Sequence, residues 1–290
     1  MVKMLALQRF FRHPRRIYEE TASKMQSPRE VGVLHEEIAS TAHEFLKTVL
    51  PPSERLEWQD VYALTADFLS LYDQRPVRDN KGGSQFSDSY WIFCLASALR
   101  PDFIIESGVY RGHSSWIFRQ ARPMAEIHCF DINLRNLVYR DPGITYHETD
   151  WINADMPSPR GARTLCFFDD HINQALRVRQ AFERGFRHLL FDDDLPVYAL
   201  HAVGNPPVPT INMLFDRRLA EGDVIEWLRE GRYKCYVHHE DNVHGARDLI
   251  VSHAHTPDIS RLLNYRPQGG VTFVRLRGTT DKCKQDSAPR

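Results

Sequence analysis

The chain has 290 residues, of which 37 are Lys or Arg and 38 are Asp or Glu. This length can bury a substantial core and favours one enlarged α/β domain, or one domain with a helical extension, while the balanced charge excludes a globally basic protein that binds nucleic acid. No apolar stretch approaches a membrane-spanning length, and the start MVKMLALQRFFRHPRR lacks the apolar core and cleavage site of a secretory signal, so we expect a cytoplasmic protein without membrane contact.

Cysteine usage agrees with a reducing compartment. The five cysteines form no C-x-x-C pair, and three of them stand in apolar runs, where a free thiol behaves as a small hydrophobic group. They are Cys94, Cys129, Cys166, Cys235 and Cys283. Neither a disulfide framework nor a zinc site is predicted.

The N-terminal part of the chain reads as helical. Residues from about 30 to 72 carry apolar residues at helical spacing, interrupted by Pro51 and Pro52. The polar segment 75–86, RPVRDNKGGSQF, is a linker or a loop that crosses the site. We therefore expect a helical extension and linker over residues 1–83. The basic side chains near the start either contact an acidic partner or belong to a solvated terminus; they are Arg9, Arg12, Arg15 and Arg16.

A strand, a glycine-bearing turn and a helix follow one another from Phe103 to Ser115. The run FII is too short for a helix, and Gly108 and Gly112 bracket a turn that needs positive φ or a close backbone approach. Ser114 stands at the expected helix start, where hydroxyls accept from free N–H groups and the helix dipole favours an anion. A cofactor with an anionic group suits this turn.

The remaining chain alternates strands with helices. We expect a helix over 90–99, a helix from Gly112 to about Gln120, and strands near Ile127, Ile144, Leu165 and Leu189. Two closing strands are expected over 248–253 and 271–276. Strands that alternate with helices in this way imply parallel βαβ units. We expect one catalytic domain over 84–278 and a polar tail over 279–290.

The spacing of the glycine turn indicates the cofactor. Glu106, Gly108, Tyr110 and Gly112 give E-x-G-x-Y-x-G rather than the dinucleotide pattern G-x-G-x-x-G. This resembles the first motif of class I S-adenosylmethionine (SAM) methyltransferases, E-x-G-x-G-x-G, with Tyr110 in place of the middle glycine. The resemblance covers about residues 84–277 and implies a Rossmann-like seven-stranded α/β sheet, SAM as cofactor, and a cofactor site that includes these four residues and Ser114.

Two later positions match the cofactor contacts of that family. Asp131 ends the next apolar segment, about twenty residues beyond the turn, where an acid at a strand end can bind both ribose hydroxyls. Asp150 and Trp151 follow the third strand. The resemblance implies that Asp150 meets the adenine amino group and that Trp151 covers the ring.

Acidic residues follow two buried strands. The first apolar run ends in two phenylalanines and is followed directly by Asp169-Asp170-His171. The second ends in Leu-Leu-Phe and is followed directly by Asp192-Asp193-Asp194. In a parallel sheet these strand ends share the edge at which ligands bind. Clustered carboxylates repel unless they are protonated, separated or bridged by a cation such as Mg²⁺, Ca²⁺ or Mn²⁺.

Here the chain looks like the metal-dependent sugar O-methyltransferases of macrolide biosynthesis and the cephalosporin hydroxylase-like group. Asp192 and Asp193 match their acid pair, and either Asp169 or Asp170 supplies a further ligand, or the metal site is absent and the aspartates cap helices. His171 is the candidate general base, because an imidazole titrates near neutrality; the alternative is a histidine bonded only to a neighbouring aspartate. The resemblance implies O-methylation in secondary metabolism.

The acceptor is expected to be a small molecule with adjacent hydroxyls, such as a sugar or a glycosylated metabolite. Tyr198 or His201 of the proline-rich segment 195–209 could line its pocket. The histidines of the later part of the chain form either an acceptor-binding loop or a polar surface; they are His238, His239, His244, His253 and His255. Homo-oligomerisation stays open, as do a catalytically silent Rossmann-like domain and a nucleotide-dependent oxidoreductase.

Overall fold

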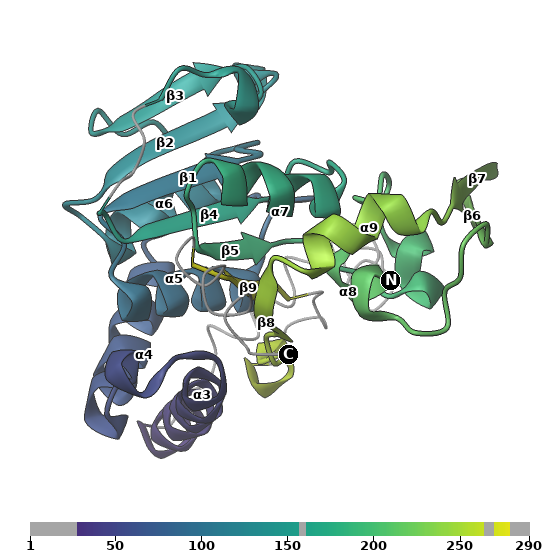
Figure 1. Cartoon of the computed structure of the whole chain (residues 1–290). Coiled ribbons are helices and arrows are strands. Elements are labelled where there is room, and N and C mark those ends of the chain that lie inside the picture. Colours follow the sequence, from purple (N-terminus) through teal and green to yellow (C-terminus); the bar gives the residue numbers. More distant parts are fainter. Residues whose placement is uncertain (1–27, 157–160, 264–269, 279–290) are drawn as a thin grey trace, which may run out of the picture.

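The architecture is an α/β fold around one large mixed sheet. The computed structural model describes residues 28–156, 161–263 and 270–278. Seven strands form the sheet in the order β3-β2-β1-β4-β5-β9-β8 (Figure 1). Their bounds are β1 Phe103–Ser107, β2 Glu126–Asp131, β3 Ile144–Glu148, β4 Thr164–Phe168, β5 His188–Phe191, β8 Ile250–His255 and β9 Thr272–Leu276.

The pairing of these strands confirms the predicted Rossmann-like sheet. β1 to β5 run parallel, and the order reverses at β1, whose neighbours are β2 and β4. β9 lies antiparallel between β5 and β8, with Leu189 opposite Val274. The carboxyl ends of β1 to β5 therefore lie at one edge, where ligands bind in open α/β sheets.

Helices cover both faces of the sheet (Figure 1). Alternate residues of β1 supply the two apolar layers, because successive strand side chains point to opposite faces. Ile104 packs in the cluster that contains α5 (Phe86–Leu99) and α6 (His113–Ala121). Ile105 packs in the cluster on the other face. That face is covered by α7 Gln174–Glu183, α8 Ile211–Phe215 and α9 Glu240–Arg247.

The N-terminal helices extend the first of these layers. α3 (Pro28–Val49) and α4 (Trp58–Tyr72) are separated by a 3-10 turn, η1 (Pro52–Glu54), at the predicted proline break. Phe68 of α4 packs against Tyr90 of α5, with ring centroids 5.2 Å apart. The extension is thus continuous with the core of the sheet domain.

Shorter elements complete the fold. A two-stranded hairpin of β6 (Val224–Arg229) and β7 (Arg232–Val237) projects beside α8 and α9 (Figure 1). The remaining 3-10 turns are η2 Leu134–Asn136, η3 Trp151–Asn153, η4 Val197–Ala202 and η5 Ser260–Leu263.

Some predictions fall outside the described residues, and others are settled within them. The four basic residues of the start and Cys283 lie in the part of the chain that is not described. Cys94, Cys129 and Cys166 are buried free thiols, as expected, whereas Cys235 is exposed. Within the described ranges, no helix combines the length and the apolar character that a bilayer crossing requires.

Candidate functional site

A cavity of about 510 Å³ opens at the carboxyl edge of the sheet. It is lined by residues at or just after four strand ends: Ser107 at the end of β1 and Gly108 after it, Asp131 at the end of β2, Asp150 after β3 and Asp169 after β4. Lys81 and Gly82 of the polar segment before α5 line it as well. The cavity therefore lies where the strand order reverses, as the Rossmann-like topology requires.

The glycine turn has the backbone that its sequence predicts. Gly108 and Gly112 have φ of +95° and +81°, and Tyr110 between them has φ of +48°. A Cβ on Gly108 would lie 2.2 Å from the carbonyl oxygen of Asp169, and the amide of Asp169 donates to Ser107 at 2.8 Å. The backbone of Gly108 thus lies against the residues that follow β4. This contact brings the turn Asp169-Asp170-His171, the acidic turn, next to the glycine turn.

Asp131 lies in the cavity wall and also holds the glycine turn. Its Oδ2 accepts from the amides of Val109 at 3.0 Å and Tyr110 at 3.1 Å. Its Oδ1 accepts from the amide of Asn133 at 2.9 Å. The next residue, Ile132, has an 81% exposed side chain and lines the cavity beside it.

Glu106 and Ser114 lie behind the turn and are not among the residues that line the cavity. The carboxylate of Glu106 is fully buried and accepts from Ser114 Oγ, from Ser115 Oγ at 2.5 Å and from Cys129 Sγ at 2.9 Å. Burial raises the pKa of Glu106 to about 7 despite these three donors. The prediction that Ser114 caps the helix is wrong, because its hydroxyl donates to Glu106 instead.

The third-strand loop differs from the prediction at Trp151. This side chain is completely buried and packs against Phe168 and Phe186, with ring centroids 5.6 Å and 5.9 Å away. It belongs to the apolar layer under α7 and does not line the cavity. The 3-10 turn that starts at Trp151 directs the ring into the core, so Trp151 cannot cover a base in the cavity.

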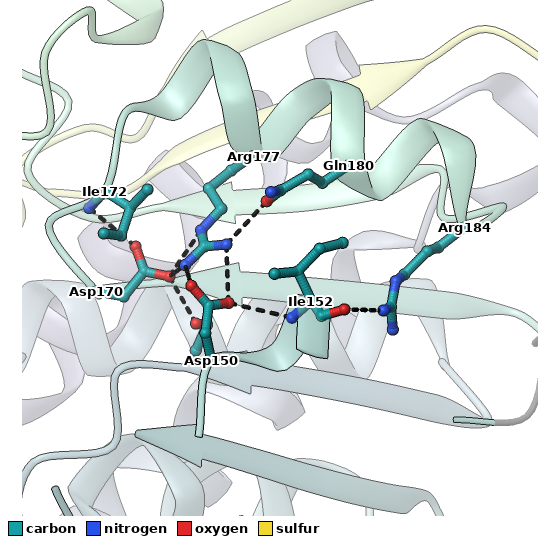
Figure 2. A network of polar contacts seen from close by, with 8 residues as sticks. Asp150, Ile152, Asp170, Ile172, Arg177, Gln180 and Arg184 are labelled. Carbon is teal, nitrogen blue, oxygen red and sulfur yellow. Dashed lines mark hydrogen bonds and ion pairs between the residues drawn. The ribbon is translucent and has the colours of Figure 1, made fainter. Parts of the chain in front are cut away.

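Asp150 lines the cavity, but its oxygens are already engaged (Figure 2). Arg177 of α7 donates to Asp150 Oδ1 at 3.0 Å and to Oδ2 at 2.9 Å, and the amide of Ile152 donates to Oδ1. Burial is the largest single influence and alone would raise the pKa of Asp150, but the hydrogen bonds from Arg177 and Ile152 and the charges of Arg177 and Arg184 together lower it. Asp150 is therefore a half-buried ion-pair partner of Arg177, and its oxygens already have donors without a ligand.

Arg177 was missed by sequence reasoning. Its guanidinium also donates through Nε to Asp170 at 2.9 Å and through Nη1 to Gln180 at 2.8 Å (Figure 2). The residue is 2% exposed although it carries a charge. An arginine between Ala175 and Val178 on the buried face of a helix was the available signal, because a buried cation needs carboxylate partners.

The acids after β4 and β5 divide into separate groups. Asp170 accepts from Arg177, from Ser107 Oγ at 2.6 Å and from the amide of Ile172 at 3.1 Å. Asp194 accepts from the Asn212 amide at 2.7 Å and from Thr272 Oγ at 2.6 Å. Neither carboxylate belongs to the group of described residues that could together hold a metal ion; of the two alternatives for the acid after β4, that group contains Asp169 and not Asp170.

Asp169, His171 and Asp193 form that group. One ligand atom from each of these residues lies within 4.8 Å of the others. His171 Nδ1 is 3.3 Å from Asp193 Oδ2, and the hydrogen bond that the imidazole donates to this carboxylate raises the pKa of His171. Burial, and then the charge of Asp192, raises the pKa of Asp169 well above its ordinary value.

Asp192 lies beside Asp169 but is not a member of this group. Burial, followed by the charge of Asp88, raises the pKa of Asp192 well above its ordinary value, and its Oδ1 accepts from the Asp193 amide at 2.9 Å. Of the expected acid pair Asp192 and Asp193, only Asp193 belongs to the described group that could hold a metal ion. The helix-cap alternative for Asp170 fails too, because Asn173 caps α7.

The backbone at this group is strained. His171 has φ of +57° and Asp193 has φ of +52°, in the left-handed region that non-glycine residues rarely adopt. With Tyr110, these are three of the five described non-glycine residues with positive φ. Such conformations cluster at functional sites, where surrounding structure holds them.

A second hollow, too narrow to hold a water molecule, shares lining residues with the cavity. Asp169, His171 and Ile172 line both, whereas Asp193 and Pro207 line only the second. Pro207 comes from the proline-rich segment that was expected to meet an acceptor. Tyr198, which is 77% exposed, and His201 line neither hollow.

The later histidines lie away from these two hollows. His238 is 1% exposed, His239 bonds Glu221 at 2.8 Å, and His253 stacks on Phe215 at 4.1 Å. His244 is exposed, and His255 bonds Thr272 at 2.9 Å. None of them lines either hollow, so the acceptor-loop alternative gains no support from their placement.

Comparisons with known proteins find structural similarity only. No protein-family model and no curated protein matches the chain. The O-methyltransferase TomG from Streptomyces achromogenes, solved with SAM, has 12% identity and a TM-score of 0.44, covering 82% of this chain and 96% of that one.

Two further solved structures are similar at the same level. The O-methyltransferase from Bacillus cereus, in complex with SAH, has 12% identity and a TM-score of 0.40, covering 83% of this chain and 100% of that one. The methyltransferase PaMTH1 from Podospora anserina, bound to SAH, has 16% identity and a TM-score of 0.38, covering 83% and 96%. Because the identities and TM-scores are this low, the fold assignment rests on the strand order and the strand pairing of the chain itself.

Proposed function

We propose that the chain is a SAM-dependent O-methyltransferase that acts on a hydroxylated small molecule. One observation carries the proposal: the cavity beside Asp131 and the glycine turn ends at Asp169 and His171. A cofactor bound in this cavity would thus lie next to His171, a side chain that can accept a proton. The acceptor hydroxyl would lie at this end of the cavity, beside Asp169 and His171.

The cavity fits a nucleoside cofactor in size and in wall chemistry. Its volume of about 510 Å³ lies in the range of small-molecule sites. We propose that Asp131 binds the ribose hydroxyls and that Ile132, rather than Trp151, supplies apolar surface for the base. Arg177 would hold Asp150 and Asp170 in place as the floor of the site.

His171 is proposed as the general base. SAM, when bound, supplies a methyl group on a sulfonium that an oxygen nucleophile can attack. The acceptor hydroxyl must lose its proton as it attacks, and His171 would take that proton. Asp193, 3.3 Å from Nδ1, would orient the ring and stabilise the imidazolium. Because Asp193 raises the pKa of His171 above its ordinary 6.5, transfer should increase as pH rises through this raised pKa.

A divalent cation is the finer part of the proposal. The oxygens of Asp169 and Asp193 and a nitrogen of His171 lie within 4.8 Å of one another, which suits a single ion. Burial, and then the charges of the neighbouring acids, raise the pKa of Asp169. Arg177 pairs with Asp150 and Asp170 instead of with Asp169. An ion here would lower the pKa of an acceptor hydroxyl and favour a substrate with adjacent hydroxyls, such as a sugar.

Calorimetric titration of SAM into chelator-treated protein, with and without Mg²⁺, tests the cofactor first. Saturable micromolar binding is the expected result, and no binding in either condition would contradict the proposal. We expect Asp131→Ala to weaken binding, and Asp193→Asn to preserve it while reducing transfer to hydroxylated acceptors. The two roles of His171 are alternatives, because a nitrogen bound to an ion cannot accept a proton. Transfer that survives chelation would exclude the ligand role and favour His171 as base, and transfer that is lost on chelation would favour the ligand role.

A further inference from the structure

Tyr110 occupies a position whose backbone suits glycine. Its φ of +48° is in the left-handed region, where a tyrosine is strained. Its side chain lines the cavity and is 38% exposed. The phenol oxygen donates to the carbonyl of Lys81 at 3.2 Å. The tyrosine therefore connects the glycine turn to a segment about thirty residues earlier, a contact that glycine could not make.

Arg111 makes a second connection to the same segment. Its guanidinium donates to the Asp79 carbonyl, and Nη1 lies 3.3 Å from Asp79 Oδ2. Consecutive residues of the turn thus hold alternate residues of the segment 79–82. From the other side, Gln85 Nε2 donates to the Asn80 carbonyl at 2.7 Å, and Asn80 Nδ2 donates to Ser84 at 2.9 Å. The segment is bonded on both sides and forms a wall of the cavity.

The charges of the cavity make Lys81 distinctive. Four carboxylates line the cavity, from Asp131, Asp150, Asp169 and Asp170. Of the two cations among its described lining residues, Arg177 is paired with two of these acids. Lys81 makes no ion pair within the part of the chain that the structure describes. It is the side chain in this wall that can receive an anionic group.

We propose that Tyr110 and Arg111 are positioning residues that hold segment 79–82 against the cavity, and that Lys81 binds a carboxylate of the ligand. This inference rests on the proposed function, since the amino-acid end of SAM carries such a carboxylate. The glycine turn, which Tyr110 joins to Lys81, would then adjoin the amino-acid end. Asp131, at the end of β2, would adjoin the ribose.

Two ligands that differ in the amino-acid end test the role of Lys81. SAH carries the carboxylate, and 5′-methylthioadenosine lacks it. We expect Lys81→Met to weaken SAH binding about tenfold and to leave 5′-methylthioadenosine unchanged. Lys81→Arg should restore SAH affinity. Lys47→Met on α3, where Lys47 pairs with Glu44, is the matched control and should change neither affinity.

Hydrogen exchange of the ligand-free protein tests the positioning role. Tyr110→Phe removes only the hydroxyl, and we expect faster amide exchange over 79–84 with unchanged exchange in β1. The same variant should weaken SAH binding, because the wall that carries Lys81 is less ordered.

The outcomes separate this inference from the proposed function. If Lys81→Met weakened the binding of both ligands equally, or did not weaken SAH binding, the carboxylate assignment would be overturned while the proposed cofactor site would stand. Unchanged exchange in Tyr110→Phe would overturn the positioning role. Failure of the wild-type protein to bind either ligand would overturn the proposed function and the role of Lys81 with it, and the exchange data would still decide the role of Tyr110.

Discussion

Gly108 shows how a single missing side chain brings two strand ends together. A Cβ at this position would lie 2.2 Å from the Asp169 carbonyl oxygen and 2.8 Å from the Asp170 amide. Both are backbone atoms, so they cannot move aside as a flexible side chain would. The acidic turn can approach the glycine turn only while residue 108 is glycine.

We therefore predict that Gly108→Ala destabilises the protein and weakens SAH binding. Gly185→Ala is the matched control, because Gly185 has a similar φ of +92° but open space around its Cβ position. The control should cost about 1 kcal/mol from positive φ alone, and Gly108→Ala about 3 kcal/mol or more. Urea denaturation measures both, and equal losses would contradict the steric argument.

Glu106 predicts a pH dependence of stability. Its pKa in the folded protein is about 7, above the ordinary 4.5, so the folded state holds a proton that the unfolded state has lost between these values. The contribution of this group is therefore fully present below about pH 4.5 and is lost as pH rises through 7, by at most about 1.4 kcal/mol per pH unit. Glu106→Gln cannot ionise and should flatten this part of the profile. A parallel profile for the variant, in denaturation from pH 5 to 8, would count against a buried titrating Glu106.

At the residue scale, prediction from sequence succeeded where strand ends decide position. Asp131, Asp169, His171 and Asp193 lie at the carboxyl edge because each follows a recognisable buried strand. It failed where a side chain has a partner remote in sequence. Asp150 meets Arg177, which stands 27 residues later, and the direction of the Trp151 ring depends on a 3-10 turn that the sequence did not reveal.

At the scale of elements, Arg177 joins α7 to the ends of β3 and β4 through Asp150 and Asp170 (Figure 2). Ser107 Oγ donates to Asp170 and adds the end of β1 to the same network. Three strand ends therefore depend on one guanidinium. Its loss would leave two neighbouring carboxylates without their cation.

Arg177→Met should destabilise the protein by about 3 kcal/mol or more, because breaking a buried pair leaves unpaired charge. Arg163→Met removes an exposed pair with Asp102 and should change stability by about 0.5 kcal/mol or less. Thermal and urea denaturation compare the two. Adding Asp150→Asn and Asp170→Asn to Arg177→Met should recover part of the loss; a loss that the added changes deepen would argue against charge as its cause.

The strands and helices of the core were predictable because their apolar periods are regular, and their bounds differ from expectation by a few residues. The β6 and β7 hairpin was not predicted. Its two-residue loop, Glu230-Gly231, has positive φ at both positions, 51° and 75°. This is the geometry of a tight hairpin turn, but Asn-Gly or Asp-Gly is its usual sequence signal.

At the scale of the whole molecule, the N-terminal helices and the sheet domain share one apolar cluster. Phe68 of α4 packs against Phe86, Tyr90 and Phe93 of α5, with centroids 5.2 to 5.6 Å apart. Thr65 also bonds the hydroxyl of the buried Tyr90 at 2.8 Å. The boundary expected at residue 83 separates segments in the sequence, whereas these contacts join them in space.

We predict that a fragment comprising residues 84–278 does not melt cooperatively as the full chain does. Removing α4 would expose Phe86, Tyr90 and Phe93 to water, and an exposed apolar patch of this kind promotes loss of fixed packing. Near-UV circular dichroism during heating, with dye binding as a second probe, measures the effect. A fragment that melts sharply at the temperature of the full chain would establish 84–278 as an independent domain.

The reversed direction of β9 has a practical consequence for attaching the protein to a surface. Thr272, where β9 begins, pairs with Phe191 at the edge that carries the cavity, and Leu276, where it ends, bonds the Arg187 carbonyl at the opposite edge. The polypeptide therefore leaves the sheet on the side away from the ligands. A sensor chip or fluorescent reporter linked after β9 should leave the cavity open to solution.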